Sequence, residues 1–349
     1  MNLDPVEKVA NAVLYEGYML YPYRATSVKN RQRFNWGALA PKAYSEAQNG
    51  TEAWEMQTEC LFEGDKNSEI SVRIRFLQLT NREIGRVDEP TESIPDKFEL
   101  VSSIEINGQL YQAWQEAVER NVALPVFRPG DEPKIMSIDL PETTEVEAIK
   151  DDDGRIAGLI IRKRFAQRGT VEATVDTSIG HGLGRLKVSV RNTTPYQDAE
   201  SDVRGDALLR SFVSTHAIIR IEGGEFVSLL EPPEKFAEAA ISCKNRGAFP
   251  VLVGAREQRT CMLSSPIILY DYPEIAHESP GDLFDSTEID EILTLRIMTM
   301  TDQEKREMRA VDDRARKILE RTELMSEEEL LGMHGALRGM ERSRKASHG

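Results

Sequence analysis

The densest group of residues able to do chemistry in this sequence is a run of carboxylates between residues 271 and 291. The run holds eight acidic residues, one histidine and no lysine or arginine. Carboxylate oxygens and an imidazole can bind divalent cations, and the candidate ligands are Asp271, His277, Glu278 and Asp285. Their order does not match an EF-hand loop. The run is therefore open to three interpretations: a solvated acidic surface, a protein-contact surface or a metal site.

The protein-contact interpretation rests on apolar residues placed among these carboxylates. Aromatic and aliphatic side chains such as Tyr270 and Leu283 are costly to leave in water, and a cluster of them marks an interaction site. The candidate partner-binding residues in this run are Tyr272, Glu274, Asp282 and Phe284.

A second segment, residues 24–44, has the opposite charge, with five basic residues, no acidic residue and several aromatic residues. Arginine and aromatic residues anchor protein interfaces. The candidate contacts here, with two tyrosines at or just before the segment, are Tyr21, Tyr23, Arg24, Asn30, Arg31 and Trp36. The segment could instead pair with the acidic run inside the chain. Single-stranded nucleic acid is a less favoured ligand, because the whole chain carries a net charge of −15.

Three other motifs favour structural roles. The glycines at 180, 182 and 184 precede a strand-like pattern, so they indicate a hairpin loop and not a phosphate cradle at a helix N-terminus. Cys243 and Cys261, even with His216, lack the close ligand pair of a zinc site, and we expect free cysteines. Ser214, His216 and Asp206 stand outside any nucleophile-elbow motif, which disfavours a hydrolase. We therefore expect no enzyme activity and no cofactor.

The composition is that of a globular protein. The chain has 349 residues, 40% of them hydrophobic, and a pI of about 5.0. The first residues do not form a signal-peptide pattern, and no run of about 18 apolar residues predicts a membrane span. Three cysteines without short spacing do not predict a disulfide framework. The expected location is the cytoplasm.

The elements that would position these residues are mostly strands. Val6, Val9, Ala10, Val13 and Leu14 predict an amphipathic helix at the N-terminus. From about residue 54 to 300 short strand-like runs recur: residues 70–76 alternate apolar and polar side chains, Asn107-Gly108 is a hairpin signal, and residues 267–270 predict a strand.

The tail is expected to be helical. Thr301-Asp-Gln-Glu304 and Ser326-Glu-Glu-Glu329 are capping boxes, each followed by an apolar stripe. The fold class is thus α+β and mainly β, with antiparallel sandwich-like sheets, an N-terminal helix and a C-terminal helical pair. The expected domains are 1–130 (helix and β-rich region), 131–300 (β-sandwich-like domain) and 301–349 (helical tail).

Two stretches together carry a resemblance. They are YEGYMLYPYR at 15–24, and SPIILYDYPE at 265–274 followed by ESPGDLFD at 278–285. The chain, from the first helix to about Arg321, resembles a family of bacterial proteins of uncharacterised function encoded beside nickel–iron hydrogenase genes. The resemblance implies a cytoplasmic accessory role in hydrogenase assembly or organisation. It carries over no catalytic residue.

The sequence therefore predicts a non-enzymatic accessory or scaffold protein that binds another protein, such as a hydrogenase subunit or maturation factor. The alternative is a metal-handling protein or metalloenzyme that uses the 271–291 carboxylates. A sandwich domain that binds a small ligand or carbohydrate is a third class, without a specific motif behind it.

Overall fold

The computed structural model describes residues 4–16, 34, 36–180, 182–197, 199–274, 297–311 and 313–324. The strands in chain order are β1 (Glu55–Thr91), β2 (Glu99–Val101), β3 (Ser103–Ile106), β4 (Gln109–Gln112), β5 (Trp114–Ala123), β6 (Lys134–Leu140), β7 (Thr143–Lys150), β8 (Ile156–Arg164), β9 (Gln167–Asp176), β10 (Leu183–Asn192), β11 (Val213–Val227), β12 (Phe249–Leu252) and β13 (Cys261–Ser265). The helices are α1 (Asp4–Tyr15), α2 (Lys42–Ala47), α3 (Arg204–Leu208), α4 (Ala237–Ile241), α6 (Asp302–Val311) and α7 (Asp313–Leu324), with a 3-10 turn η2 (Glu234–Phe236). The predicted class, mainly β with antiparallel sheets and an N-terminal helix, is confirmed.

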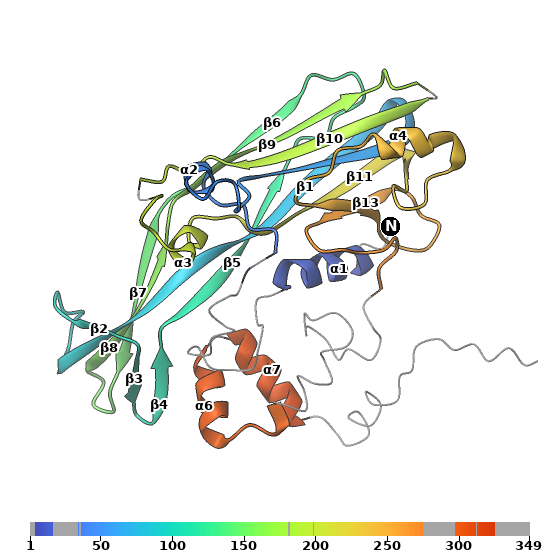
Figure 1. Ribbon diagram of the computed structural model, residues 1–349. Helices are drawn as coiled ribbons and strands as arrows, with labels where there is room; N and C mark the ends of the chain where they lie inside the picture. The colour runs from blue at the N-terminus through green and yellow to red at the C-terminus, as the bar shows by residue number, and fades with distance from the viewer. Residues whose placement is uncertain are drawn as a thin grey trace, which may run out of the picture.

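A single long strand organises the sheet. β1 has 37 residues and crosses the whole molecule (Figure 1), changing neighbours as it goes. Its first part pairs with β10 and β11, its middle with β11 and β5, and its end with β8 and β2, always antiparallel. A strand this long can serve two layers because it can bend. The pairing of β1 with β11 is irregular in the stretch of β1 from Gly64 to Glu69, and such an irregularity lets a strand bend.

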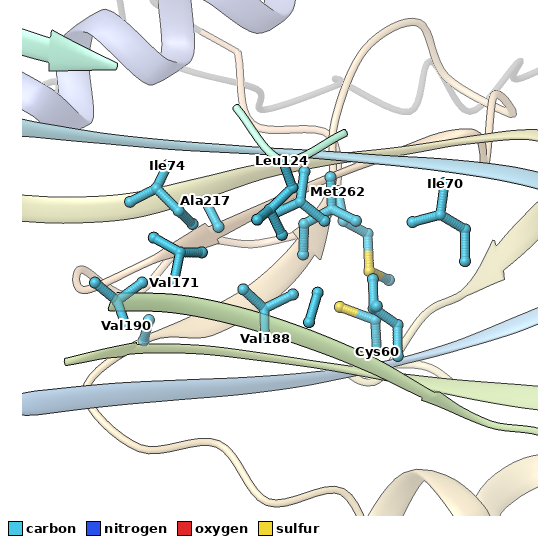
Figure 2. Packing of buried hydrophobic residues seen from close by; sticks show 14 of the residues in the cluster. Cys60, Ile70, Ile74, Leu124, Val171, Val188, Val190, Ala217 and Met262 are labelled. Atoms are coloured by element: carbon cyan, nitrogen blue, oxygen red, sulfur yellow. The ribbon is translucent and has the colours of Figure 1, made fainter. Parts of the chain in front are cut away.

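The main core lies between two layers of this sheet. Residues of β9 and β10, such as Val171, Val188 and Val190, face Ile74 and Ala217 from β1 and β11 across the core (Figure 2). Along β1 the even-numbered residues of 70–76 are fully or almost fully buried in this cluster. The alternation predicted from the sequence therefore selects the inner face, as expected for a strand packed on a sandwich core.

The sequence alternation suggests that the polar face of residues 70–76 is exposed to water. In the structure this face is only partly exposed. Arg75 is buried because α1 lies over this face and its Val9 and Val13 pack with Ile218 of β11 and Leu263 of β13. The helix stripe predicted for residues 6–14 is the buried side of α1. The alternation along residues 70–76 could not show that α1 covers Arg75.

The predicted division at residue 130 does not coincide with a break in the sheet. β1 and β5 come from the first predicted segment, whereas β8, β10 and β11, which pair with β1, come from the second. The β-rich part is one continuous 11-stranded sheet, because its longest strand supplies a neighbour to both segments.

Beyond the sandwich, the sheet extends as an arm formed by β7, β8, the end of β1 and β2, with the β3–β4 hairpin packed against it. The hairpin turn is the predicted Asn107-Gly108, and both residues have positive φ (52° and 72°), as a two-residue type I′ turn requires. The arm has its own small core of isoleucines, including Ile84, Ile106 and Ile160.

The described tail contains α6 and α7, which contact each other, and α6 also contacts β4 (Figure 1). The capping box at its start is confirmed: the Thr301 backbone N–H donates to Glu304 Oε2 at 2.9 Å, and the Glu304 N–H donates to Thr301 Oγ1 at 3.3 Å. The apolar stripe predicted behind that box is divided between these two helices. The helix predicted after Ser326 lies outside the described residues.

Candidate partner-contact surface

The basic segment lies against the chain just before the acidic run, where Gly37 approaches Pro266. Gly37 has a φ of 57°, its carbonyl oxygen accepts the Thr215 N–H at 3.0 Å, and a Cβ added to it would lie 2.7 Å from Pro266 Cγ. Only glycine combines this backbone conformation with so close an approach. This contact brings together Gly37, the neighbour of Trp36, and Pro266, which lies two residues before Ile268.

The strand predicted to reach Tyr270 ends at Ser265. Pro266 follows, and proline has no N–H to give to a sheet ladder, so residues 266–270 leave the sheet. They still alternate: Ile267 and Leu269 pack on the cluster under α1, whereas Ile268 and Tyr270 are 95% and 81% exposed. Together with Trp36, which is 49% exposed, Ile268 and Tyr270 form what we call the apolar surface.

Asp271 fixes the far end of this exposed segment. Its Oδ1 accepts the Leu252 N–H at 2.8 Å and its Oδ2 accepts the Ser228 hydroxyl at 2.5 Å. The N–H of Tyr272 donates to the Leu252 carbonyl at 2.7 Å, and its ring packs partly buried on the main core. Burial raises the pKa of the Tyr272 phenol. Asp271 and Tyr272, predicted as a metal ligand and a partner contact, thus hold the segment in place.

Glu274 is exposed and pairs with the exposed Arg256 at 3.6 Å, at the edge of this region. Within the described part of the chain no group of three or more histidine, cysteine, aspartate or glutamate residues is placed to hold a metal ion. The remaining predicted contact or metal residues lie outside the described ranges, and they are Tyr21, Tyr23, Arg24, Asn30, Arg31, His277, Glu278, Asp282, Phe284 and Asp285.

A polar network fastens α1 behind the apolar surface. Glu7, Asn11 and Tyr15 are spaced four residues apart and lie on one side of the helix. Glu7 pairs with Arg73, the Asn11 oxygen accepts Arg75 Nη2 at 2.7 Å, and the Tyr15 hydroxyl donates to Glu119 Oε1 at 2.5 Å.

The Glu119 carboxylate also accepts Arg75 Nη2, at 3.3 Å, so Arg75 joins α1 to β5. Because α1 supports Ile267 and Leu269, this network also determines where the apolar surface stands.

His216 lies beside Arg75, as its direct partner in the β1–β11 register. It is fully buried, and its Nδ1 is 2.8 Å from the Ser214 carbonyl oxygen, so Nδ1 carries the proton. Burial, with Arg75 and Arg73 nearby, lowers the pKa of this imidazole to about 3. The contact is to the Ser214 backbone and not to its hydroxyl, and Asp206 is exposed on α3, which argues against a catalytic triad.

The other motifs have structural roles. Cys60 and Cys261 are buried, Cys243 is partly buried, and all three are free, as expected for these cysteines. Burial raises the pKa of the Cys261 thiol to about 12. The glycines at 180 and 182 have positive φ in the loop between β9 and β10, which confirms the hairpin prediction.

The sequence matches no family model and no curated protein. None of the helices in the described ranges is long and apolar enough to cross a membrane. Sequence reasoning did not single out Ile268; Pro266, which ends β13 and turns every second residue of an apolar run outward, was the available signal.

Proposed function

We propose that this protein is a non-enzymatic accessory or scaffold protein that acts by binding another protein through the apolar surface. The observation that carries the proposal is the exposure of Ile268 and Tyr270 on a segment anchored at both ends, by Pro266 against Gly37 and by Asp271 on Leu252. An anchored segment loses little conformational entropy on binding, so more of the apolar burial contributes to affinity.

The composition of the surface supports a protein as the partner. Trp36 and Tyr270 are residue types that dominate protein interfaces, and large exposed apolar side chains gathered in one region mark interaction sites. The charge-biased sequences that adjoin the surface, basic before Trp36 and acidic after Tyr270, favour an electrostatic contribution to partner choice. The resemblance to proteins encoded beside nickel–iron hydrogenase genes makes a hydrogenase subunit or maturation factor, in the cytoplasm, the proposed partner.

Changing Ile268 and Tyr270 together to serine should abolish co-purification of the partner with the tagged protein from its native host. The reason is the loss of the two most exposed apolar anchors, while the free energy of unfolding should change by no more than about 0.5 kcal/mol because neither side chain is in the core. The measurement is the recovery of hydrogenase subunits and maturation factors by quantitative mass spectrometry at low and moderate salt.

Ile241→Ser is the matched control, because Ile241 is 85% exposed but lies on α4, which contributes no residue to the apolar surface. This variant should recover the partner as well as the wild type does. Equal recovery with the double serine variant would show that the apolar surface is not the binding site. Recovery of no hydrogenase component by the wild type would contradict the proposed partner.

A further inference from the structure

A polar belt on β1 separates the sandwich core from the core of the arm. Gln78, Thr80 and Arg82 continue the inward-facing row of β1 after Phe76, and all three are buried. The same row becomes apolar again at Ile84. Polar side chains buried between two apolar cores need hydrogen-bond partners, so a group in this belt without a partner needs an explanation.

Four arginines gather at the belt: Arg82, Arg120, Arg162 and Arg164. The first lies on β1, directly opposite Arg162 of β8, and Arg120 lies on β5. Arg82 pairs with Glu116 at 3.0 Å, and Arg162 pairs with the same carboxylate at 2.9 Å.

Two further carboxylates lie at the belt. Glu147 pairs with Arg162 at 2.7 Å and Glu145 pairs with Arg164. Three of the four guanidinium groups thus pair with three carboxylates, in a chain whose net charge is −15.

Arg120 is the arginine left without a carboxylate among the described residues. Its Nε and Nη2 donate to the Gln78 Oε1 at 2.9 and 2.7 Å. The Gln78 amide is itself fixed, because its Nε2 donates to the Phe165 carbonyl at 3.0 Å. Burial and the nearby Arg164 cation lower the pKa of Arg120. A neutral amide oxygen therefore orients this guanidinium but does not neutralise its charge.

Thr80 supplies a second group without a partner. It is fully buried, and its Oγ1 has no hydrogen-bond partner within the part of the chain that the structure describes. In the strand register, Thr80 is opposite Glu116 of β5 on one side. On the other side Asn81 is opposite Lys163 of β8, so the next residue of β8, Arg164, is opposite Thr80. A buried hydroxyl without a partner can donate to a bound oxyanion.

We infer that this belt is a binding site for an oxyanion, a carboxylate or phosphate group of a small ligand, held chiefly by Arg120 with Arg164 and Thr80. The guanidinium fork of arginine matches the geometry of both groups, and an anion here would neutralise the charge of Arg120. The inference does not depend on the partner-contact surface, because no residue of that surface takes part.

The test is a titration of the full chain with inorganic phosphate and, separately, with succinate, at constant ionic strength. Binding is measured by isothermal titration calorimetry and by the rise in the thermal midpoint. We expect saturable binding of at least one probe, and its identity distinguishes a phosphate from a carboxylate ligand. Arg120→Gln should weaken that binding by roughly tenfold or more, because a charge-assisted bond is lost.

Arg168→Gln is the control, since Arg168 is 62% exposed and pairs with Asp139 on the β6–β9 edge. It should bind as the wild type does. Thr80→Val, which keeps the shape of the side chain, should weaken binding severalfold and decides the question if Arg120→Gln does not fold. The inference is overturned if neither probe binds saturably, or if the folded Arg120→Gln or Thr80→Val proteins bind as tightly as the wild type.

Discussion

Replacing Gly184 by alanine should lower the free energy of unfolding by about 3 kcal/mol. Gly184 of β10 is directly opposite Phe62 of β1, and an added Cβ would lie 2.2 Å from Phe62 Cζ. The ring is almost fully buried in the main core, so it cannot move aside without disturbing its neighbours. The measurement is urea unfolding followed by circular dichroism.

A double-mutant cycle identifies the cause of this loss. Phe62→Ala alone should cost about 3–5 kcal/mol by leaving a cavity. The double variant should be more stable than the sum of the two losses predicts, because the new methyl group then occupies space that the ring has vacated.

Gly205→Ala is the control for this cycle, because Gly205 lies in α3 and a Cβ there would contact nothing. Its stability should change by no more than about 1 kcal/mol. Additive losses from Gly184→Ala and Phe62→Ala would mean that the ring is not what excludes a side chain at position 184.

Stability should fall by about 1.4 kcal/mol for each pH unit below 6.5 because of His216 alone. The folded pKa of this imidazole is about 3 and the ordinary value is 6.5, so the unfolded chain binds a proton that the folded chain does not. The contribution to stability is complete above pH 6.5 and is lost as the pH falls from 6.5 toward 3. At pH 4.5 the loss amounts to about 2.7 kcal/mol.

His216→Gln isolates this effect, since glutamine does not titrate and the carboxylates are the same in both proteins. Its unfolding free energy, measured by urea denaturation from pH 7.5 to 4.5, should fall less steeply than that of the wild type by about 1.4 kcal/mol per pH unit below 6.5. Parallel curves would show that His216 is accessible to protons in the folded state, contrary to its burial under α1.

Local patterns were sufficient for the elements whose geometry depends on near neighbours. The Asn107-Gly108 turn follows from the two positive φ angles that these residues accept, and the Thr301–Glu304 box from hydrogen bonds within four residues. The buried side of α1 follows from helical periodicity.

Chain contacts distant in sequence decided the candidate surface. Trp36 could be named as an exposed aromatic contact, but its place on the molecule depends on the close approach of its neighbour Gly37 to Pro266, more than 200 residues away in the chain. Asp271 could be named as a carboxylate, yet its bonds to Ser228 and Leu252 give it an anchoring role. Side-chain type indicates what a residue can bind, and only the fold supplies its partner.

The sequence by itself determined the mainly β, antiparallel class and the two segments of interest, because alternation and charge bias are properties of consecutive residues. The tertiary structure alone decided that β1 pairs with strands of both predicted segments, that α1 covers Arg75, and that Arg120 and Thr80 share one face with Arg164. These outcomes depend on strand register, and a shift of one residue would turn each side chain to the opposite face of the sheet.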